Sequence, residues 1–406
     1  MQSDTTATSQ AYISRLANWE DALEEALAAT DARAGTGVDF ALVFASYHHR
    51  EGYEQILARL RERTGARVIA GCSGQGIIGT SREIEGEPAL SLLLARLPGI
   101  QIEPVHVSQP AIAAAGGGEG LVAAIGIPPT SVNAWVILAD PFHLEVERMV
   151  GLLEEGYPTR PVVGGLASGA PGAPNTHVFL NGAVYDEGAV ALAIGGDWTV
   201  RTLVSQGATP IGDPWTITGA HDNILESVGG RPAYDVLAET VEGLEPDVRR
   251  RAVTNLLIGL AMDEYRESHA RGDFLIRNLI GVDRESGALA ISAYPRAGQT
   301  VQFQMRDGQA ADEELVEMLR NEQTALGGST PAAAILCSCN GRGVGLFGQP
   351  DHDARRISEE LGPVPLAGFF CNGEIGPVGG RTFLHGFTAS LALFVPKRLA
   401  ARPIRI

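Results

Sequence analysis

Apolar residues along this chain gather in short runs, and several of these runs are followed by a segment with helical periodicity. The clearest example starts with the apolar run 41–46, passes through a polar turn into a helix predicted over 52–63, and continues into a second apolar run at 66–71. A strand, a helix and a strand in this order predict a βαβ unit with two parallel strands. The apolar run 89–95 predicts one more strand beside them.

The same order of elements recurs, which predicts an internally repeated fold. In the first two copies, 25 positions separate the end of the first strand from a glycine of the second, from Ser46 to Gly71 and from Asp140 to Gly165. The corresponding interval in the last copy is 29 positions. The predicted copies span 41–95, 134–194, 256–292 and 332–395, and the third of them lacks a clear helix.

Two further patterns predict antiparallel pairing beside these parallel pairs. Residues 300–305 alternate strictly between polar and apolar side chains, as a half-buried strand does. Asn181 and Gly182 separate two short apolar runs and supply the positive φ angles of a type I′ hairpin turn. The predicted fold class is therefore α/β, with two pseudo-repeated mixed-sheet α/β halves and helices packed on the sheets.

The chain is predicted to divide into three parts. An amphipathic helix at 14–30 follows a polar N-terminus, and a helix-poor stretch at 209–231 separates the two halves. The expected limits are 1–36 for the polar tail and amphipathic helix, 37–220 for the first half and 221–406 for the second.

Composition and charge narrow the class of protein. Hydrophobic residues make up 45% of the chain and charged residues 19%, which is typical of a soluble globular protein. The net charge is −17 and the longest basic run is Arg249 to Arg251, so a nucleic-acid partner is not expected. Lys397 is the only lysine, and this excludes Schiff-base, Walker and Ser-Lys chemistry, because each needs a lysine in a prepared pocket.

The sequence carries no signal for a membrane, a metal or a cofactor. The polar residues 1–10 do not resemble a signal peptide, and no apolar run reaches the roughly 18 residues of a membrane span, so a cytoplasmic protein is expected. Four cysteines are too few for a disulfide framework. Cys337 and Cys339 lack the paired spacing of a zinc site, and the glycines at 341–345 do not form a dinucleotide-binding motif.

Each second strand ends in small residues followed by a polar cluster. These clusters lie at 71–74, 164–169 and 368–374. Glycines there allow a ligand to approach main-chain N–H groups, and strand ends are where α/β sheets usually bind small molecules. The alternative interpretation of each cluster is a tight turn without a ligand.

Motifs in both halves resemble those of the FIST domain family. In the first half the motif is at 70–73, and in the second half the motifs lie at 274–283, 339–343, 346–348 and 370–377. The resemblance implies an intracellular sensor of small ligands, amino acids among them, in bacterial signal transduction, with F-box relatives in eukaryotes. Because no kinase, cyclase or chemoreceptor module is fused here, it implies ligand binding more directly than signalling.

The residue chemistry of these motifs is compatible with an amino-acid-like ligand. Arg277 interrupts an apolar strand and Arg342 lies in a glycine-rich turn, and a guanidinium can hold a carboxylate by two parallel hydrogen bonds. Glu374 is the candidate partner for an ammonium group. The alternative roles are a salt bridge to Asp283 for Arg277 and a structural hydrogen bond for His385. The predicted ligand-binding residues are Cys72, Ser73, Arg277, Asn340, Arg342, Cys371, Asn372, Glu374 and His385.

Cys72 and Cys371, which we place at equivalent positions of the first and last copies, form the basis of an enzymatic alternative. If the copies are related by pseudo-symmetry, both thiols face one cleft, where His385 or His48 can activate either as a nucleophile. In this interpretation Cys72, Cys371 and His385 are catalytic. The competing interpretation is that both cysteines are inert core residues.

The leading functional prediction is a cytoplasmic sensory protein that binds a small polar, amino-acid-like metabolite and acts on a signalling partner, without being an enzyme. The alternative is a cysteine-dependent hydrolase or transferase on the same scaffold. A third class is a pure interaction scaffold.

Overall fold

Two units of different sheet type make up the chain in this computed structural model, which describes residues 6–32, 37–264, 266, 269 and 272–400. Residues 1–5 and 33–36 of the expected N-terminal segment lie outside the described residues. What we call the three-sheet unit comprises Met1–Val204, Leu315–Leu384 and Thr388–Ile406, and the antiparallel unit comprises Ser205–Glu314 and His385–Phe387.

The three-sheet unit repeats one sheet pattern, and within the described residues it forms three six-stranded sheets. The six strands of each sheet follow one order. An edge strand comes first and pairs with an antiparallel strand, the two parallel strands of a βαβ unit come next, and the two strands of a hairpin come last. The mixed α/β fold class is thereby confirmed. The first sheet is β1 (Thr8–Ser14), β6 (Leu90–Arg96), β2 (Phe40–Ser46), β3 (Val68–Gly74), β10 (Val178–Leu180) and β11 (Ala183–Tyr185).

The other two sheets follow the same spatial order. The second is β7 (Ile100–Val107), β12 (Ala189–Gly196), β8 (Ala134–Ala139), β9 (Val162–Leu166), β24 (Glu374–Val378) and β25 (Arg381–His385). The third is β13 (Trp198–Ser205), β26 (Ala389–Pro396), β22 (Ala333–Cys339), β23 (Leu366–Cys371), β4 (Gly76–Gly79) and β5 (Arg82–Glu85).

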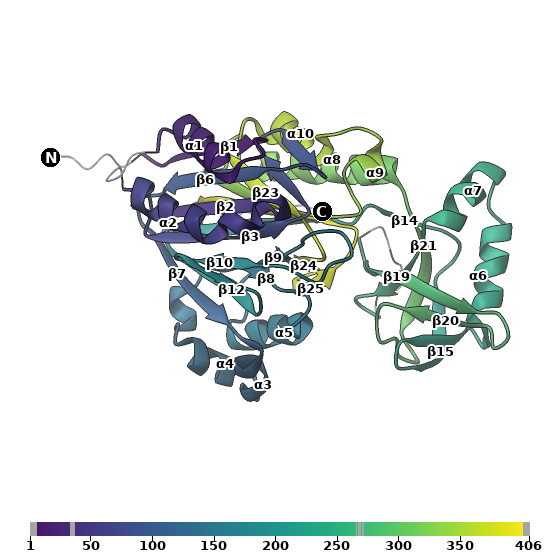
Figure 1. The fold of residues 1–406 in the computed structure, drawn as a ribbon. Helices are drawn as coiled ribbons and strands as arrows, with labels where there is room; N and C mark the ends of the chain where they lie inside the picture. The colour runs from purple at the N-terminus through teal and green to yellow at the C-terminus, as the bar shows by residue number, and fades with distance from the viewer. Residues whose placement is uncertain (1–5, 33–36, 265, 267–268, 270–271, 401–406) are drawn as a thin grey trace. The chain divides into compact units, whose positions relative to one another are not determined.

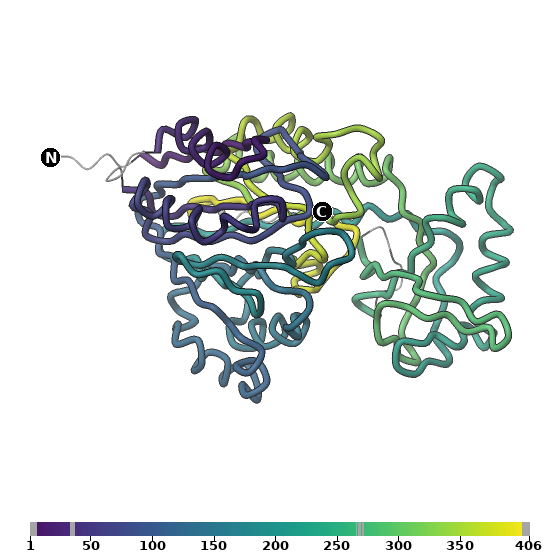
Figure 2. Tube along the Cα trace, in the orientation of Figure 1, coloured from purple at the N-terminus to yellow at the C-terminus, as the bar shows by residue number. Residues whose placement is uncertain are grey.

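The hairpins are exchanged between the copies. The hairpin β4–β5 follows the first βαβ unit but pairs with β23 of the third sheet, β10–β11 follows the second but pairs with β3, and β24–β25 follows the last but pairs with β9. Figure 2 shows the yellow C-terminal strands lying among the purple and blue N-terminal ones. The last copy therefore shares one unit with the first two, and these compact units do not coincide with the expected halves 37–220 and 221–406.

A glycine sets the register of every parallel pair in this unit. In each pair the second strand carries a glycine opposite a residue of the first, and a Cβ on that glycine would lie 1.7, 1.8 or 2.0 Å from the facing carbonyl oxygen. Only glycine permits this approach. The three pairs are Gly71 with Val43, Gly164 with Ile137, and Gly368 with Leu336.

The central strands of these sheets are buried on both faces, which explains the continuous apolar runs of the sequence. The inner faces share one core, in which the rings of Phe44 and Phe369 from two different sheets stack with centroids 5.2 Å apart. Helices cover the outer faces (Figure 1). They are α1 (Trp19–Ala29) and α2 (Tyr53–Thr64) on the first sheet, α3 (Gln109–Ala114), α4 (Gly118–Ile125) and α5 (Val146–Gly156) on the second, and α8 (Gly308–Ala325) and α10 (His352–Leu361) on the third.

Short helical segments complete the three-sheet unit. They are η1 (Tyr47–Gly52), η2 (Pro129–Ser131), α9 (Val344–Phe347) and α11 (Lys397–Ala400). The predicted hairpin turn is confirmed, because Asn181 and Gly182 have φ angles of 50° and 97°. Among the described residues, no helix combines the length and apolar character that crossing a bilayer requires.

The antiparallel unit replaces the expected third copy. Its strands β18 (Leu256–Ala261) and β19 (Phe274–Asp283) pair antiparallel, without a helix between them in the described residues, so the prediction of a βαβ copy at 256–292 is wrong. Additional pairing of β18 with β21 (Thr300–Arg306) closes the sheet into a ring. The strands are β14 (Ala208–Pro210), β21 (Thr300–Arg306), β15 (Trp215–His221), β16 (Ile224–Val228), β20 (Ala288–Ile291), β19 (Phe274–Asp283) and β18 (Leu256–Ala261), with β17 (Arg231–Pro232) beside β16 and with helices α6 (Ala233–Glu242) and α7 (Pro246–Thr254).

Candidate functional site

The ends of the second strands meet in the three-sheet unit. Counted from the register glycines, Gln75, Ser168 and Asn372 are equivalent, each four positions further along the chain. The Ser168 hydroxyl accepts a hydrogen bond from Gln75 N at 2.7 Å and donates one to the carbonyl of Phe370. Asn372 Nδ2 donates to the carbonyl of Ala167 at 3.1 Å. These bonds join the strand ends of all three copies.

A pocket of about 280 Å³ opens beside this junction. Its lining consists of Gln75, Phe142, Asn372 and the loop 169–174. None of these lining residues carries a formal charge, and the polar groups they offer are two side-chain amides and the main chain of the loop. The Phe142 side chain is 47% exposed, so it presents an apolar ring to a ligand. We call this cavity the strand-end pocket.

Asp140 positions the Phe142 wall of the pocket. It follows strand β8 and is buried, and its Oδ2 accepts hydrogen bonds from Phe142 N at 3.1 Å and His143 N at 2.6 Å. The same oxygen lies 3.0 Å from His143 Nδ1, and the Thr176 hydroxyl donates to Oδ1 at 2.6 Å. The carboxylate thus holds the turn that carries Phe142.

Asn340 and Asn372 contact each other at the end of the third sheet. Asn340 Nδ2 donates to Asn372 Oδ1 at 2.9 Å, and Asn340 N donates to the carbonyl of Cys371 at 3.0 Å. Of the predicted ligand-binding residues, Asn372 lines the strand-end pocket directly. Ser73 does not line the pocket but helps to hold two of the strand ends together, because its hydroxyl donates a hydrogen bond to the carbonyl of Ser168 at 2.8 Å.

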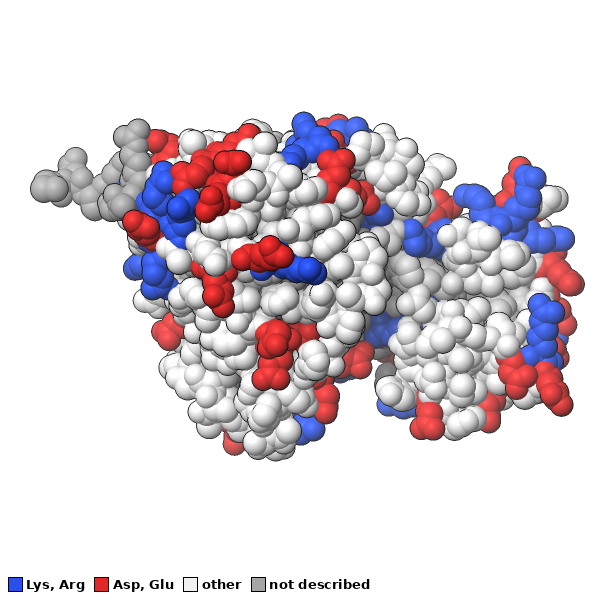
Figure 3. All heavy atoms as spheres, viewed as in Figure 1, with Lys and Arg blue, Asp and Glu red and all other residues white. Residues whose placement is uncertain are grey.

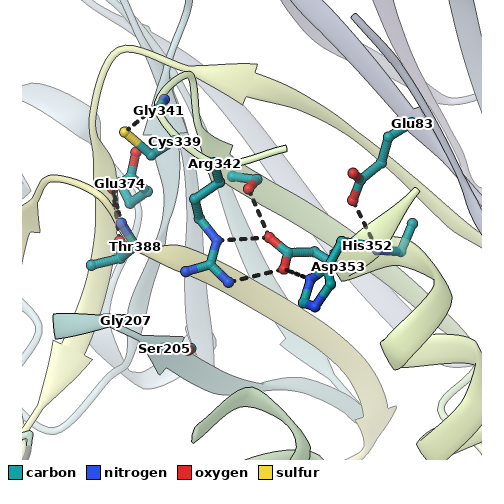
Figure 4. Close-up of polar contacts among 12 residues, drawn as sticks. Glu83, Ser205, Gly207, Cys339, Gly341, Arg342, His352, Asp353, Glu374 and Thr388 are labelled. Atoms are coloured by element: carbon teal, nitrogen blue, oxygen red, sulfur yellow. Dashed lines mark hydrogen bonds and ion pairs between the residues drawn. The ribbon is translucent and has the colours of Figure 1, made fainter. Parts of the chain in front are cut away.

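Arg342 binds a carboxylate within the protein in place of the expected ligand. Its Nε and Nη2 donate to the two oxygens of Asp353 at 2.8 and 2.9 Å, and both side chains are at most 1% exposed. His352 Nδ1 contacts Asp353 from the other side at 2.9 Å (Figure 4). Burial disfavours the charge of Asp353, but Arg342 and His352 outweigh it and hold the pKa of this carboxyl well below its usual range.

Glu83 lies beside this ion pair. Its Oε1 accepts a hydrogen bond from Ala354 N in the first turn of α10 at 2.9 Å, and Oε2 is buried without a hydrogen-bond partner among the described residues. Burial and the neighbouring Asp353 raise the pKa of Glu83 to about 8. Its surroundings therefore favour the neutral form of Glu83 and the ionised form of Asp353.

Glu374 is enclosed by hydrogen-bond donors of the three-sheet unit. Thr388 donates to its Oε2 from the hydroxyl at 2.7 Å and from the main chain at 3.0 Å, and the Cys371 thiol donates to Oε1 at 3.1 Å. Burial raises the pKa of Glu374 to about 7, although these hydrogen bonds and Arg342 oppose the shift. The carboxyl is completely buried and is absent from the pocket lining.

The two cysteines of the enzymatic alternative are not equivalent. Cys72 follows its register glycine by one position and Cys371 by three, so the counterpart of Cys371 in the first copy is Gly74. Both thiols are fully buried in the central core, and burial raises the pKa of both. Cys371 Sγ contacts the Ser338 carbonyl and Glu374 rather than an imidazole. This geometry favours the interpretation that Cys72 and Cys371 are inert core residues in the reduced protein over the interpretation that they are catalytic nucleophiles.

Arg277 and His385 belong to the antiparallel unit. Arg277 is half-buried on β19, where Nη1 donates to the carbonyl of Ile276 at 3.1 Å. The carboxylate of Asp283 accepts hydrogen bonds from Ser286 and Glu285, which lower its pKa. His385 is buried, with 4% of its surface exposed.

Sequence reasoning missed most of the pocket wall. Gln75 follows the glycine cluster 71–74 and the loop 169–174 continues the cluster 164–169, but Phe142 follows a first strand, which has no such cluster. Asp140 directly before Pro141 at a strand end was the available signal for a carboxylate that holds a turn.

The described residues contain no group of His, Cys, Asp and Glu arranged to hold a metal ion. On the face drawn in Figure 3, acidic and basic side chains are interspersed.

A mixed α/β unit whose strand ends enclose a small uncharged pocket is typical of proteins that bind small molecules. Residues 39–231 match the FIST N domain and residues 233–377 match the FIST C domain. The chain belongs to the FIST family, whose domains bind small molecules in sensory signal transduction.

Uncharacterized proteins of Mycobacterium tuberculosis and Mycobacterium bovis are similar to this chain along most of its length. Each is 37% identical over 374 residues, which cover 92% of this chain and 96% or 95% of the relative. Two cyanuric acid hydrolase structures, one of them from A. caulinodans, match 96% of this chain and 99% of their own, with TM-scores of 0.36 and 0.34 and identities of 9% and 11%. A similarity at this level carries no argument about activity.

Proposed function

We propose that this protein is an intracellular sensor that binds a small polar metabolite in the strand-end pocket. The observation that carries the proposal is the convergence of three equivalent strand ends, through Gln75, Ser168 and Asn372, on one cavity of about 280 Å³. A tight turn without a ligand could explain any one of the glycine clusters by itself. It does not explain why the three strand ends that follow the register glycines meet at the same cavity.

The lining supports a proposal for the ligand's chemistry. The amides of Gln75 and Asn372 both donate and accept hydrogen bonds, and Phe142 offers an apolar face. A small ligand with amide or hydroxyl groups and no net charge matches these groups best. An amino-acid-like ligand fits the same volume, and its two charges would have to be met by main-chain N–H and C=O groups of the loop 169–174.

Binding can act as a signal only if the ligand has different affinities for two conformations of the protein. The wall of the pocket that can differ between such conformations is the loop 169–174, which contains two glycines and two prolines and exposes Pro171, Gly172 and Pro174. We propose that a ligand held against Asn372 and Phe142 favours one conformation of this loop, which a signalling partner then reads.

A thermal-shift screen with the common amino acids and with neutral amides of similar size tests this function. A ligand present at one hundred times its dissociation constant should stabilise the protein by about 2.7 kcal/mol. Asn372→Ala should abolish the shift, and Arg277→Ala, which changes the antiparallel unit, is the matched control that should preserve it. If no compound of either class shifts the transition, the proposal fails.

A further inference from the structure

Cys339 and Cys371 are directly paired across the parallel strands β22 and β23. Both lie at the last position of their strand and, by the alternation of side chains, on the face that carries Cys337 and Phe369 into the central core. Paired strands are about 4.8 Å apart, and the Cα atoms of disulfide-bonded cysteines lie about 4.4–6.8 Å apart. The backbone therefore already satisfies the main distance requirement of a disulfide.

The two thiols differ in exposure. Cys339 is half-buried, and its Sγ accepts a hydrogen bond from Gly341 N at 3.5 Å (Figure 4). Cys371 is fully buried, and its thiol donates to Glu374 Oε1 at 3.1 Å. After burial and Glu374, the nearby Cys337 and then Cys339 also raise the pKa of Cys371. An oxidant from solution thus reaches Cys339 first, and Cys371 is the thiol behind it.

We propose that Cys339 and Cys371 form a reversible disulfide when a hydroperoxide oxidises the protein. In the first step Cys339 Sγ attacks the peroxide, the O–O bond breaks, and sulfenic acid and one molecule of water or alcohol are formed. In the second step Cys371 Sγ attacks the sulfenic sulfur, the S–O bond breaks, and the hydroxyl leaves as water. The peroxide is reduced and the two thiols are oxidised by two electrons in total.

Glu374 supplies the proton acceptor for the second step. A buried thiol is a poor nucleophile until its proton is removed, and the hydrogen bond from Cys371 to Glu374 Oε1 gives that proton a direct path. Thr388 holds the other carboxyl oxygen with two hydrogen bonds and so fixes the orientation of Glu374. This role also explains why a completely buried carboxyl is hydrogen-bonded to a thiol.

The disulfide would act on the strand-end pocket, a consequence that rests on the function proposed above. Asn340 follows Cys339 and Asn372 follows Cys371, and the two asparagine side chains are joined by a hydrogen bond of 2.9 Å. Closing a disulfide at the preceding residues shifts this pair, of which Asn372 lines the pocket. Oxidation should therefore change ligand affinity without any contact between the sulfur atoms and the ligand.

Peptide mapping of the full-length chain tests the disulfide without any ligand. The protein is treated with hydrogen peroxide, remaining thiols are alkylated, and the digest is analysed by mass spectrometry. We expect a cross-linked pair that contains Cys339 and Cys371, a loss of two hydrogen atoms from the intact mass, and full reversal by dithiothreitol. Cys337→Ser is the matched control, because Cys337 is paired with Phe369 and should not be required.

Other results would overturn the proposal. These are a disulfide between Cys337 and Cys371, or oxidation of Cys339 to sulfinic acid without a cross-link.

Two variants test the separate steps. In Cys371→Ser, sulfenic acid at Cys339 should persist and be trapped by dimedone. Glu374→Gln should slow disulfide formation by about 10²-fold or more, and an unchanged rate would remove Glu374 from the reaction. A failure of the ligand screen leaves the disulfide result unaffected, so the two proposals can fail separately.

Discussion

Replacement of Asp353 by asparagine should destabilise the three-sheet unit strongly, because it leaves a buried guanidinium without its counter-charge. Arg342 is paired with Asp353 through two hydrogen bonds of 2.8 and 2.9 Å, and neither side chain exposes more than 1% of its surface. Ser338 Oγ donates to the same carboxylate at 3.0 Å. Asparagine keeps the volume but has one acceptor oxygen, so the pair cannot be rebuilt.

The expected loss for Asp353→Asn is about 3–5 kcal/mol, the cost of breaking a buried ion pair by removing one partner. Urea unfolding followed by far-UV circular dichroism measures it. The double variant with Arg342→Met should be more stable than Asp353→Asn alone, because the unpaired charge is then gone. A loss under about 1 kcal/mol, or additive losses in the double variant, would refute the reasoning.

Three further predictions follow from the geometry. Burial raises the pKa of Glu83 to about 8, so the native state retains a proton that the unfolded chain loses near pH 4.3, and stability should fall as pH rises between about 4.3 and 8. Unfolding of Glu83→Gln over this range should show a smaller decline, and an equal decline would contradict the assignment. Gly164→Ala places a Cβ 1.8 Å from a carbonyl oxygen and should cost about 3 kcal/mol or more, whereas Gly151→Ala, on an open face of α5, should stabilise by about 0.5–1 kcal/mol in the same urea assay. Phe142→Ala should weaken the binding of a ligand from the screen by about tenfold or more in calorimetric titration while leaving the fold intact; unchanged affinity would place the ligand elsewhere.

The βαβ copies could be predicted because their strands are buried on both faces and their helices are amphipathic. The runs at 41–46, 134–140 and 332–339 correspond to β2, β8 and β22, and each is followed by its helix and parallel partner. The segment 256–292 has apolar runs of the same kind, but it pairs antiparallel. Short apolar runs indicate burial and do not by themselves specify the direction of pairing.

The exchange of hairpins lay beyond sequence reasoning. A hairpin such as β4–β5 carries no residue that names its partner, and its pairing with β23 depends on how the three copies assemble. The partner of Arg342 was equally beyond sequence reasoning. The glycine-rich turn of this arginine is evident in the sequence, but Asp353, which it binds, lies in α10 of the same copy. The guanidinium of Arg342 predicted an anionic ligand, but the anion that it binds is a carboxylate of the protein itself.

A crystal structure with a compound from the screen is the most direct test of ligand binding in the strand-end pocket. Density for the compound is expected against Gln75, Phe142 and Asn372. Density at another cavity of the three-sheet unit, about 400 Å³ in volume and lined by Tyr12, Arg15 and Arg82, would contradict this placement of the ligand.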